Sequence, residues 1–380
     1  MASVGGKTHS IVISGYYGFA NSGDEAVLHA ILTALRDQAE AAGISIEPIV
    51  LSVNPAQTMR VHQVRAVHRM RPREVLRALL GADALISGGG SLLQDVTSVK
   101  SIFYYMAIIR LALMLRKKVF IYAQGIGPIR RSGWFGPMIR SAFAACTAVC
   151  VRDQASRALL VSYGLPAERI DVVPDPVMGL GASLTERPPM EGEASAQRTP
   201  TIGVSVRYWR KDRLDLHAVA EGLAGVLRTT DAQLVMLPFH LPADREASQD
   251  VLRRLKSLGV PDHRCHIHPG SDHPKDMLAR VATCDVLVGM RLHSLIYAAT
   301  SGVVPIGICY DPKVEQFLQQ IGETSVGTTD DLSSSKLKAR VLDALQRGSA
   351  ARTSDQRAAI QALQSAAKRP AQQLIHELRI

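Results

Sequence analysis

The sequence predicts an α/β protein built from two Rossmann-like, doubly wound domains that face a cleft. Three observations lead to this fold class. The chain has 380 residues, which is too long for one ordinary hydrophobic core. Short apolar runs alternate with amphipathic segments, the strand–helix rhythm of a parallel sheet covered by helices. A polar stretch rich in Pro, Gly and Ser interrupts this rhythm at residues 180–199, after which it starts again.

The first half of the chain carries six short apolar runs that predict strands. Amphipathic segments between these runs predict helices that cover the sheet. We expect these elements to form an N-terminal domain over residues 1–179. The expected strands are Ile11–Gly15, Ile46–Val53, Ala84–Ser87, Val119–Ala123, Ala148–Val151 and Ile170–Val173, and the expected helices are Asp24–Ala39, Arg73–Leu80, Ile102–Leu115, Phe135–Ala145 and Gln154–Tyr163.

The second half repeats the pattern, so we expect an interdomain linker at 180–199 and a C-terminal domain over 200–350. Its expected strands are Thr201–Val206, Gln233–Leu237, Cys265–His268, Asp285–Val288 and Val303–Ile308, and its expected helices are Leu216–Leu227, Glu246–Leu258, Pro274–Ala282, Leu292–Thr300 and Val314–Ile321. The Ala-, Gln- and Arg-rich pattern within residues 351–380 predicts one long C-terminal helix, which can pack back across the hinge.

The charge balance narrows the classes of binding partner. The formal net charge is +10 and the pI is about 9.5, which suits nucleic acid, an anionic lipid surface or an anionic substrate. Nucleic acid is the weakest of the three, because aromatic residues make up only 5% of the chain and no nucleic-acid-binding motif is present. A basic face that is simply solvated remains the alternative to all three.

The cysteine content and the N-terminus favour a cytoplasmic protein. The five cysteines are an odd number in mostly apolar settings, without a C-x-x-C pair, which predicts reduced thiols. The first ten residues are polar and show no signal peptide. The apolar stretch Ile102–Leu115 contains Arg110 and is too short to span a bilayer. We expect no metal site, since the spacing of His263, Cys265, His266, His268 and His273 matches no closed zinc pattern.

Cationic side chains follow several predicted strands of the C-terminal domain. Arg291-Leu292-His293-Ser294 follows one buried strand, and Tyr310-Asp311-Pro312-Lys313-Val314 follows the next. Arg207 ends the first strand of this domain, and His240 follows the second. Open α/β sheets bind ligands at the carboxyl ends of their strands. Fixed cations beside an imidazole suit a small, highly charged anion that undergoes proton transfer, whereas a solvated rim is the alternative.

A glycine-rich turn follows the first strand of the N-terminal domain. Glycines in the turn 15–23 allow close approach of the backbone to a ligand, and the helix that follows presents unpaired N–H groups. Asn21, Asp24 and Glu25 lie where a sugar hydroxyl can be bound or deprotonated. For Asp24 the alternative is that it only caps its helix.

Two further loops end strands of the same predicted sheet. The three glycines Gly88–Gly90, with Asp95 shortly after them, indicate close approach to a substrate. The segment 124–128 follows the next strand and has the same character. Arg152 ends the strand after that, and its alternative role is a salt bridge to Asp153 or a contact between domains.

Two basic segments raise the possibility of membrane contact. The first carries six arginines, and the second, at 130–135, places two arginines beside Trp134 and Phe135. Cations next to aromatic residues suit the interface of an anionic membrane, although a solvated basic face is the alternative for each segment. The first segment consists of Arg60, His62, Arg65, His68, Arg69, Arg71, Arg73 and Arg77.

In their order and spacing these motifs resemble the polysaccharide pyruvyl transferase family, in particular its CsaB-type members. The resemblance covers most of the chain except the linker and the C-terminal tail. It is carried by Gly-Tyr-Tyr-Gly-Phe-Ala-Asn-Ser-Gly-Asp-Glu at 15–25, Ser-Gly-Gly-Gly-Ser-Leu-Leu-Gln-Asp at 87–95, Gln-Gly-Ile-Gly-Pro at 124–128, Val-Arg-Asp at 151–153, Arg-Leu-His-Ser at 291–294 and Tyr-Asp-Pro-Lys-Val at 310–314.

The resemblance implies a GT-B-like pair of domains and transfer of pyruvate from phosphoenolpyruvate to a sugar as a ketal. The acceptor it implies is N-acetylmannosamine of a lipid-diphosphate-linked disaccharide, a precursor of the cell-wall polymer that anchors S-layer proteins. No cofactor is implied, because phosphoenolpyruvate is a co-substrate. The basic N-terminal domain is then expected to lie at the inner face of the plasma membrane.

This implied chemistry assigns a role to each candidate residue. His293 is the expected general acid, and Asp24 or Glu25 is the expected base. The expected phosphoenolpyruvate ligands are Arg152, Arg207, Arg291 and Lys313, and the expected acceptor-binding residues are Tyr17, Asn21, Gly89, Gly90, Asp95 and His240. Two alternatives remain at this stage: a GT-B glycosyltransferase that uses a nucleotide sugar, and a non-catalytic protein that binds anionic polymer or lipid.

Overall fold

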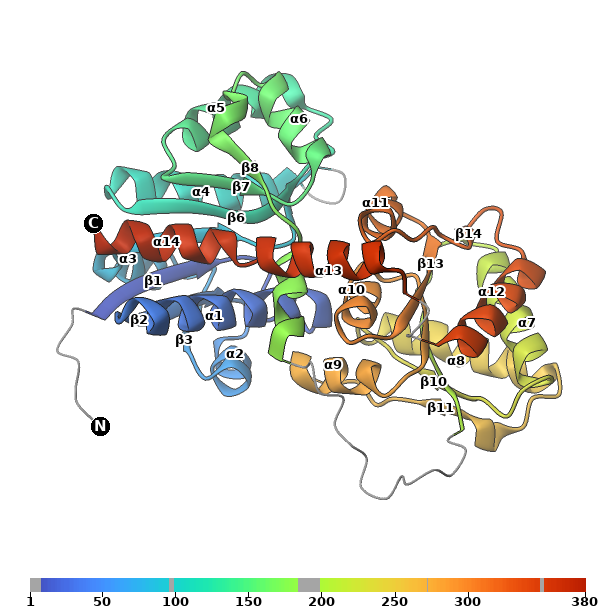
Figure 1. Ribbon diagram of the computed structural model, residues 1–380. Helices are drawn as coiled ribbons and strands as arrows, with labels where there is room; N and C mark the ends of the chain where they lie inside the picture. The colour runs from blue at the N-terminus through green and yellow to red at the C-terminus, as the bar shows by residue number, and fades with distance from the viewer. Residues whose placement is uncertain (1–7, 96–98, 184–198, 272, 349–351) are drawn as a thin grey trace, which may run out of the picture. The chain divides into compact units, whose positions relative to one another are not determined.

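Two parallel β-sheets, each in its own unit of the chain, organise the protein. The computed structural model describes residues 8–95, 99–183, 199–271, 273–348 and 352–380 (Figure 1). Unit 1 comprises Met1–Gly179 and Leu363–Ile380, and unit 2 comprises Leu180–Ala362. Most of the expected linker 180–199 lies outside the described residues.

The sheet of unit 1 has the strand order β3-β2-β1-β4-β6-β7-β8, and all of its pairings are parallel. The order reverses between β1 and β4, as in a doubly wound sheet. The strands are β1 (Thr8–Ser14), β2 (Ser45–Ser52), β3 (Arg65–His68), β4 (Ala84–Gly88), β5 (Ser91–Leu93), β6 (Lys118–Ile126), β7 (Ala148–Val151) and β8 (Ile170–Val172). The short strand β5 lies outside this order and pairs with β6.

Helices cover both faces of this sheet. The buried sides of α3, α4, α5 and α6 share one hydrophobic core, and α1 packs beside α14 in Figure 1. Ile11, Val12 and Ile13 of β1 are all fully buried, because a central parallel strand is covered on both faces. The helices are α1 (Ser22–Ala42), α2 (Pro55–His62), α3 (Pro72–Gly81), α4 (Val99–Met114), α5 (Ser132–Ala144), α6 (Gln154–Ser162) and α14 (Arg369–Arg379), with the 3₁₀ turns η1 (Ala167–Arg169) and η2 (Pro176–Ser183).

Unit 2 repeats the architecture with the strand order β11-β10-β9-β12-β13-β14. This order also reverses once, between β9 and β12. The strands are β9 (Thr201–Ser205), β10 (Gln233–Met236), β11 (Cys265–Ile267), β12 (Val286–Gly289), β13 (Val304–Cys309) and β14 (Gly327–Thr328). The helices are α7 (Leu214–Leu227), α8 (Ala243–Ser257), α9 (Pro274–Ala282), α10 (Leu292–Thr300), α11 (Pro312–Gln320) and α12 (Ser334–Arg347), with the 3₁₀ turn η3 (Asp262–Arg264). The helix α13 (Ser354–Ala366) begins in unit 2, and its residues from Leu363 onward belong to unit 1.

The predicted fold class, two Rossmann-like doubly wound domains, is confirmed. Most of the expected elements are present within a few residues of their predicted bounds. The basic segment that contains Arg60 forms regular structure that the sequence did not predict, namely α2 and β3. The expected C-terminal helix is present as two helices, α13 and α14, because Pro370 in the first turn of α14 cannot continue the preceding helix.

No helix in the described parts of the chain combines the length and the apolar character that crossing a bilayer requires.

Candidate active site

Polar side chains of unit 2 gather at the carboxyl ends of four adjacent strands. Arg207 follows β9 and Arg291 follows β12, the two strands between which the strand order reverses. His240 follows β10, on one side of this pair, and Tyr310 follows β13, on the other. Because a reversal of strand order opens a crevice at this edge of a parallel sheet, it is the expected position of a ligand site.

Asp244 holds Arg291 in place. The carboxylate of Asp244 is completely buried and accepts two bonds from Arg291, one from Nε at 2.9 Å and one from Nη2. It also accepts the backbone N–H of His240 at 2.9 Å. This bidentate pairing fixes the plane of the guanidinium and compensates its charge. The local sequence does not single out Asp244, because its partner Arg291 lies 47 residues away along the chain.

Aromatic rings flank the second guanidinium of the site. The Arg207 guanidinium carbon lies 4.7 Å from the centre of the Tyr310 ring and 5.4 Å from that of Trp209. The two rings are tilted against each other, with their centres 4.9 Å apart. Among the described residues, Nε of Arg207 and the hydroxyl of Ser205 are buried and have no hydrogen-bond partner. Buried donors without a partner at a strand end indicate a place for an anionic ligand.

Three more titratable groups follow strands at the same edge of this sheet, namely His240 after β10, His293 after β12 and Lys313 after β13. Burial, Arg291 and Arg207 lower the pKa of His240, against the opposing effect of Asp244, so that its imidazole is neutral near pH 7. His293 lies in the first turn of α10 and is partly exposed. Lys313 lies in the first turn of α11, and its backbone N–H donates to the capping carboxylate of Asp311 at 3.0 Å. His240, which the sequence grouped with the acceptor-binding residues, thus lies among the cations of unit 2.

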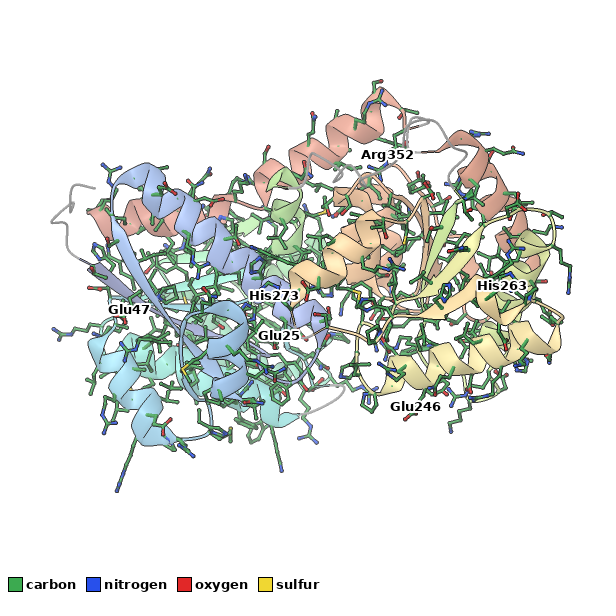
Figure 2. All side chains as sticks on the ribbon, turned by 90° about the horizontal axis from the view of Figure 1, so that it is seen from below. Glu25, Glu47, Glu246, His263, His273 and Arg352 are labelled. Carbon is green, nitrogen blue, oxygen red and sulfur yellow. The ribbon has the colours of Figure 1, made fainter. Side chains whose placement is uncertain are left out.

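In unit 1 the strand order reverses between β1 and β4, and two glycine-rich loops follow these strands. Tyr17, in the first loop, is 1% exposed, and its hydroxyl donates to the carbonyl oxygen of Gly88 at 2.8 Å. Glu25, which is labelled in Figure 2, accepts the backbone N–H of Gly18 at 2.7 Å and lies 2.9 Å from Nε2 of His62. Tyr17 and Glu25 therefore stabilise the loop through these contacts, and their expected roles in acceptor binding and proton transfer stay predictions.

Asp24 and Asn21 remain at the ligand edge of the loop. Asn21 is the N-cap of α1 and accepts the backbone N–H of Gly23 at 3.1 Å, so Asp24 does not serve as the cap. The side-chain amide of Asn21 donates to Asp24, which is partly exposed. A Cβ atom on Gly90 would lie 3.0 Å from Asp24 Oδ1, and one on Gly89 only 2.0 Å from a methyl carbon of Val27. The space at Gly89 is therefore needed for the packing of α1.

Two other candidates of unit 1 hold parts of the protein together. Arg152 is buried and pairs with Asp175 at 3.2 Å, and its Nη2 donates to the hydroxyl of Ser91 at 2.9 Å. Asp95 accepts the backbone N–H groups of residues 130 and 131 at 2.7 and 2.9 Å, which lowers the pKa of its carboxyl. Asp95 thus fixes the loop before α5, and its expected role in acceptor binding stays a prediction. The partner of Arg152 is Asp175, and Asp153 instead caps α6.

The basic segment around β3 is not a uniform cationic face. Arg69 is buried, and its Nη1 donates to the carbonyl oxygen of Gly15 at 3.0 Å. Arg65 pairs with Glu47 at 2.9 Å, and Arg71 pairs with Glu74 at 2.9 Å. Of the histidines weighed as metal ligands, His263 and His273 lie far apart on unit 2 in Figure 2. No cluster of three metal-binding side chains occurs among the residues that the structure describes.

The arrangement in unit 2 suits binding of a small dianion or trianion. Arg207 supplies an unused N–H donor at Nε, Arg291 is aligned by its carboxylate partner, and Lys313, whose ammonium lies 3.9 Å from Asp311, adds a third cation. The imidazoles of His240 and His293 add two groups that can donate a hydrogen bond to such a ligand or accept one from it. In unit 1, the carboxylate of Asp24 beside the amide of Asn21 suits binding of hydroxyl groups.

Comparison with known proteins identifies both the family and the fold. The model of a family described as polysaccharide pyruvyl transferase matches residues 21–312. A solved UDP-GlcNAc 2-epimerase from Neisseria meningitidis, bound to UDP-GlcNAc, has a TM-score of 0.63 at 10% identity, covering 97% of this chain and all (100%) of its own. A glycosyltransferase from Rickettsia africae has a TM-score of 0.61 at 13% identity, covering 98% of this chain and 97% of its own. At this identity the likeness shows the two-domain fold alone.

Proposed function

Because the chain belongs to the polysaccharide pyruvyl transferase family, we propose that it transfers pyruvate from phosphoenolpyruvate to a sugar as a ketal and releases phosphate. One observation carries the choice of donor: Arg207, Arg291, His240 and His293 meet at the strand edge of unit 2. Phosphoenolpyruvate carries a carboxylate and a phosphate on three carbons, so it needs at least two cations at short range. A neutral sugar or a lipid chain would not need them.

The two arginines suit different parts of the donor. Arg207 has a buried N–H without a partner, so it can give a new charge-assisted hydrogen bond to the phosphate or the carboxylate. Arg291 has two of its nitrogens engaged by Asp244 and presents its remaining N–H groups in a fixed plane. Such preorganisation reduces the entropy lost on binding. Lys313 neutralises charge as phosphate leaves.

Ketal formation makes two new C–O bonds at C2 of the donor and breaks the bond from C2 to the phosphate oxygen. In the first step, a sugar hydroxyl adds to C2 while C3 gains a proton and becomes a methyl group. In the second step, a neighbouring hydroxyl displaces phosphate from C2. His293 supplies the proton, to C3 or to the leaving phosphate, and Asp24 accepts the proton of a hydroxyl. Each proton lost by the sugar is thus matched by one gained by C3 or by phosphate.

The acceptor we propose is N-acetylmannosamine of a lipid-diphosphate-linked precursor of a cell-wall polymer. The partly exposed Asp24 and Asn21 at the edge of unit 1 support a hydroxyl-rich acceptor. The family assignment supports a polysaccharide or its precursor. Arg152, buried between Asp175 and Ser91, then helps to hold the loops of unit 1 in position.

We also propose that unit 1 contacts an anionic membrane surface through the outer sides of α3, α4 and α5. These helices bury their other sides in one core. Neither α4 nor α5 contains an acidic residue. Large apolar side chains are exposed on this layer, including Phe103 at 55% and Trp134 at 85%. The exposed cations of α3 and α4 are Arg73, Arg77, Lys100 and Arg110, and exposed Arg131 is the N-cap of α5. Apolar side chains among cations suit a lipid interface.

One experiment tests the transfer directly. The protein is incubated with phosphoenolpyruvate and a synthetic lipid-diphosphate N-acetylmannosaminyl-N-acetylglucosamine, and the product is examined by mass spectrometry for an added pyruvate ketal. We expect the ketal with the wild type, none with His293→Ala, and wild-type turnover with His263→Ala, an exposed histidine of the same unit. Full turnover by His293→Ala would reject its role as the acid.

The glycosyltransferase alternative is tested with the same protein. The fold it shares with a solved structure bound to UDP-GlcNAc is compatible with a nucleotide-sugar donor. We expect phosphoenolpyruvate to raise the melting temperature and UDP-GlcNAc to leave it unchanged. Stabilisation by UDP-GlcNAc alone would favour the glycosyltransferase.

The membrane proposal is tested by sedimentation with phosphatidylglycerol vesicles. Each cation near an anionic surface contributes about 1 kcal/mol, so Arg73→Glu with Arg77→Glu should weaken binding by more than about tenfold. Binding should also fall as salt is added. Leu214→Ser, which changes an apolar residue of unit 2 that is 57% exposed, serves as the control. Unchanged binding by the double variant would exclude this surface.

A further inference from the structure

Two aromatic rings form a small exposed platform in the loop after β1. The rings of Tyr16 and Phe19 are stacked, with their centres 3.9 Å apart and their planes within 4° of each other. Tyr16 is 41% exposed, while Phe19 is partly buried. An aromatic ring exposed to solvent loses the stabilisation that burial would give it. Exposed apolar surface of this kind often marks a place where a ligand or a partner binds.

The loop is fixed on both sides of Tyr16, so the platform is rigid. Before it, the carbonyl oxygen of Gly15 accepts from Arg69 at 3.0 Å. After it, Tyr17 points inward to β4, and the backbone N–H of Gly18 donates to Glu25. Gly18 has a φ of +83°, and a Cβ atom there would lie 2.3 Å from the hydroxyl of Ser52, so only glycine fits.

Arg69 supports the platform from its inner side. Its guanidinium carbon lies 5.5 Å from the centre of the Phe19 ring and 4.1 Å from that of Tyr104. The cation is thus held between aromatic rings as well as by the Gly15 carbonyl. The sequence placed Arg69 in a surface basic segment, whereas its buried position makes it a positioning residue for this loop.

The candidate base lies beside the platform. Asp24 is in the first turn of α1, which begins directly after this loop, and Asn21 donates to its carboxylate. Burial and the nearby charge of Asp24 raise the pKa of the Tyr16 hydroxyl, against the effect of Arg69. The flat ring of Tyr16 can contact the apolar face of a ligand ring, and the carboxylate of Asp24 can bind a hydroxyl of the same ligand.

We propose that the Tyr16–Phe19 platform is the stacking surface for the pyranose ring of the acceptor sugar, and that Arg69 positions it. The inference rests on the proposed function, because it assigns Asp24 as the base for a hydroxyl of the stacked sugar. A pyranose has an apolar face of C–H groups and a polar rim of hydroxyls, and it therefore fits a ring bordered by a carboxylate and an amide. Tyr16 then contacts the C–H face of the pyranose ring, and Asp24 binds its hydroxyl groups.

A nucleobase also has a flat face that stacks on aromatic side chains, so the experiment separates the two ligands. Saturation-transfer NMR is recorded for the wild type and for Tyr16→Ala with N-acetylmannosaminyl-N-acetylglucosamine and, separately, with UDP. We expect ring-proton signals of the disaccharide with the wild type and their loss with Tyr16→Ala. A UDP signal that depends on Tyr16 would overturn the assignment of a sugar.

Steady-state kinetics give the second test. We expect Tyr16→Ala to raise the acceptor KM about tenfold, as for loss of one stacking contact, and to leave the KM for phosphoenolpyruvate unchanged. Tyr16→Phe should restore the acceptor KM, because the ring rather than the hydroxyl does the stacking. Met59→Ala, an apolar residue of α2 that is 45% exposed, is the matched control. An unchanged acceptor KM in Tyr16→Ala would overturn the inference.

Arg69→Met tests the positioning role. It removes the bond to the Gly15 carbonyl but keeps a long apolar side chain, so we expect a raised acceptor KM with an unchanged KM for phosphoenolpyruvate. A change in the phosphoenolpyruvate KM alone would overturn that role. If the wild type forms no ketal, the proposed function fails, yet the NMR experiment still decides whether Tyr16 binds the sugar.

Discussion

The pairing of Asp244 with Arg291 permits a quantitative prediction for Asp244→Asn. The substitution keeps the size of the side chain but removes the charge that compensates Arg291, which is only 17% exposed. It also weakens three hydrogen bonds, two from Arg291 and one from the His240 backbone. Removal of one partner of a buried ion pair costs about 3 to 5 kcal/mol.

We take about 3 kcal/mol, the lower end of this range, because Arg291 retains some contact with solvent and asparagine can still accept a bond. For a domain of the size of unit 2, each kcal/mol lowers the melting temperature by about 2 to 4 °C. The expected decrease is therefore about 6 to 12 °C. The affinity for phosphoenolpyruvate should fall as well, since Arg291 loses its fixed orientation.

The two tryptophans of the chain allow a measurement confined to unit 2. Trp134 belongs to α5 of unit 1, whereas Trp209 lies beside Arg207 in unit 2. In a Trp134→Phe background, tryptophan fluorescence on heating therefore reports the unfolding of unit 2. Circular dichroism of the same samples reports the whole chain.

A matched control and a double variant complete the design. Asp212→Asn also removes the carboxylate partner of an arginine, but Asp212 is 46% exposed, so we expect little change in stability. Adding Arg291→Met to Asp244→Asn removes the uncompensated charge, so the double variant should lose less stability than the two single losses added together. A melting temperature for Asp244→Asn equal to that of Asp212→Asn would refute the reasoning.

Three further predictions concern the cationic site of unit 2 and the buried ion pair of unit 1. The pKa of His240 lies below its usual 6.5, so its contribution to stability is complete above that pH and decreases as the pH falls. His240→Asn should therefore reduce the loss of melting temperature between about pH 7 and pH 5. Trp209→Ala removes one of the rings beside Arg207 and should raise the KM for phosphoenolpyruvate about two- to fivefold in a phosphate-release assay. Asp175→Asn leaves the buried Arg152 without its carboxylate partner and should lower the denaturant midpoint of the N-terminal unit.

The strand ends were predictable from sequence, but the partners of the side chains on them were not. Arg207, Arg291 and His293 directly follow apolar runs, so strand placement alone brought them to one edge. Asp244 and Asp175 become partners of Arg291 and Arg152 only through the fold, across 47 and 23 residues. Their positions depend on helix and loop geometry that no local pattern specifies.

In the region around β3, the local sequence pattern did not predict the structure. β3 is a four-residue edge strand, and none of its residues is fully buried, so its sequence lacks the apolar run typical of a central strand. The density of arginine there favoured a surface interpretation. Yet Arg69, directly after the strand, is buried between aromatic rings. A cation can be buried in this way when aromatic faces and a carbonyl oxygen replace its water.

The return of the chain to unit 1 has a consequence for synthesis. The buried side of α14 carries Ala371, Leu374 and Ile375, and Gln373 of the same helix donates to Asp171 at 2.8 Å. These residues emerge from the ribosome only after all of Leu180–Ala362 has been made. Until then the nascent unit 1 exposes the apolar surface that α14 later covers. The order of synthesis thus leaves this unit incomplete and prone to chaperone binding while unit 2 can already fold.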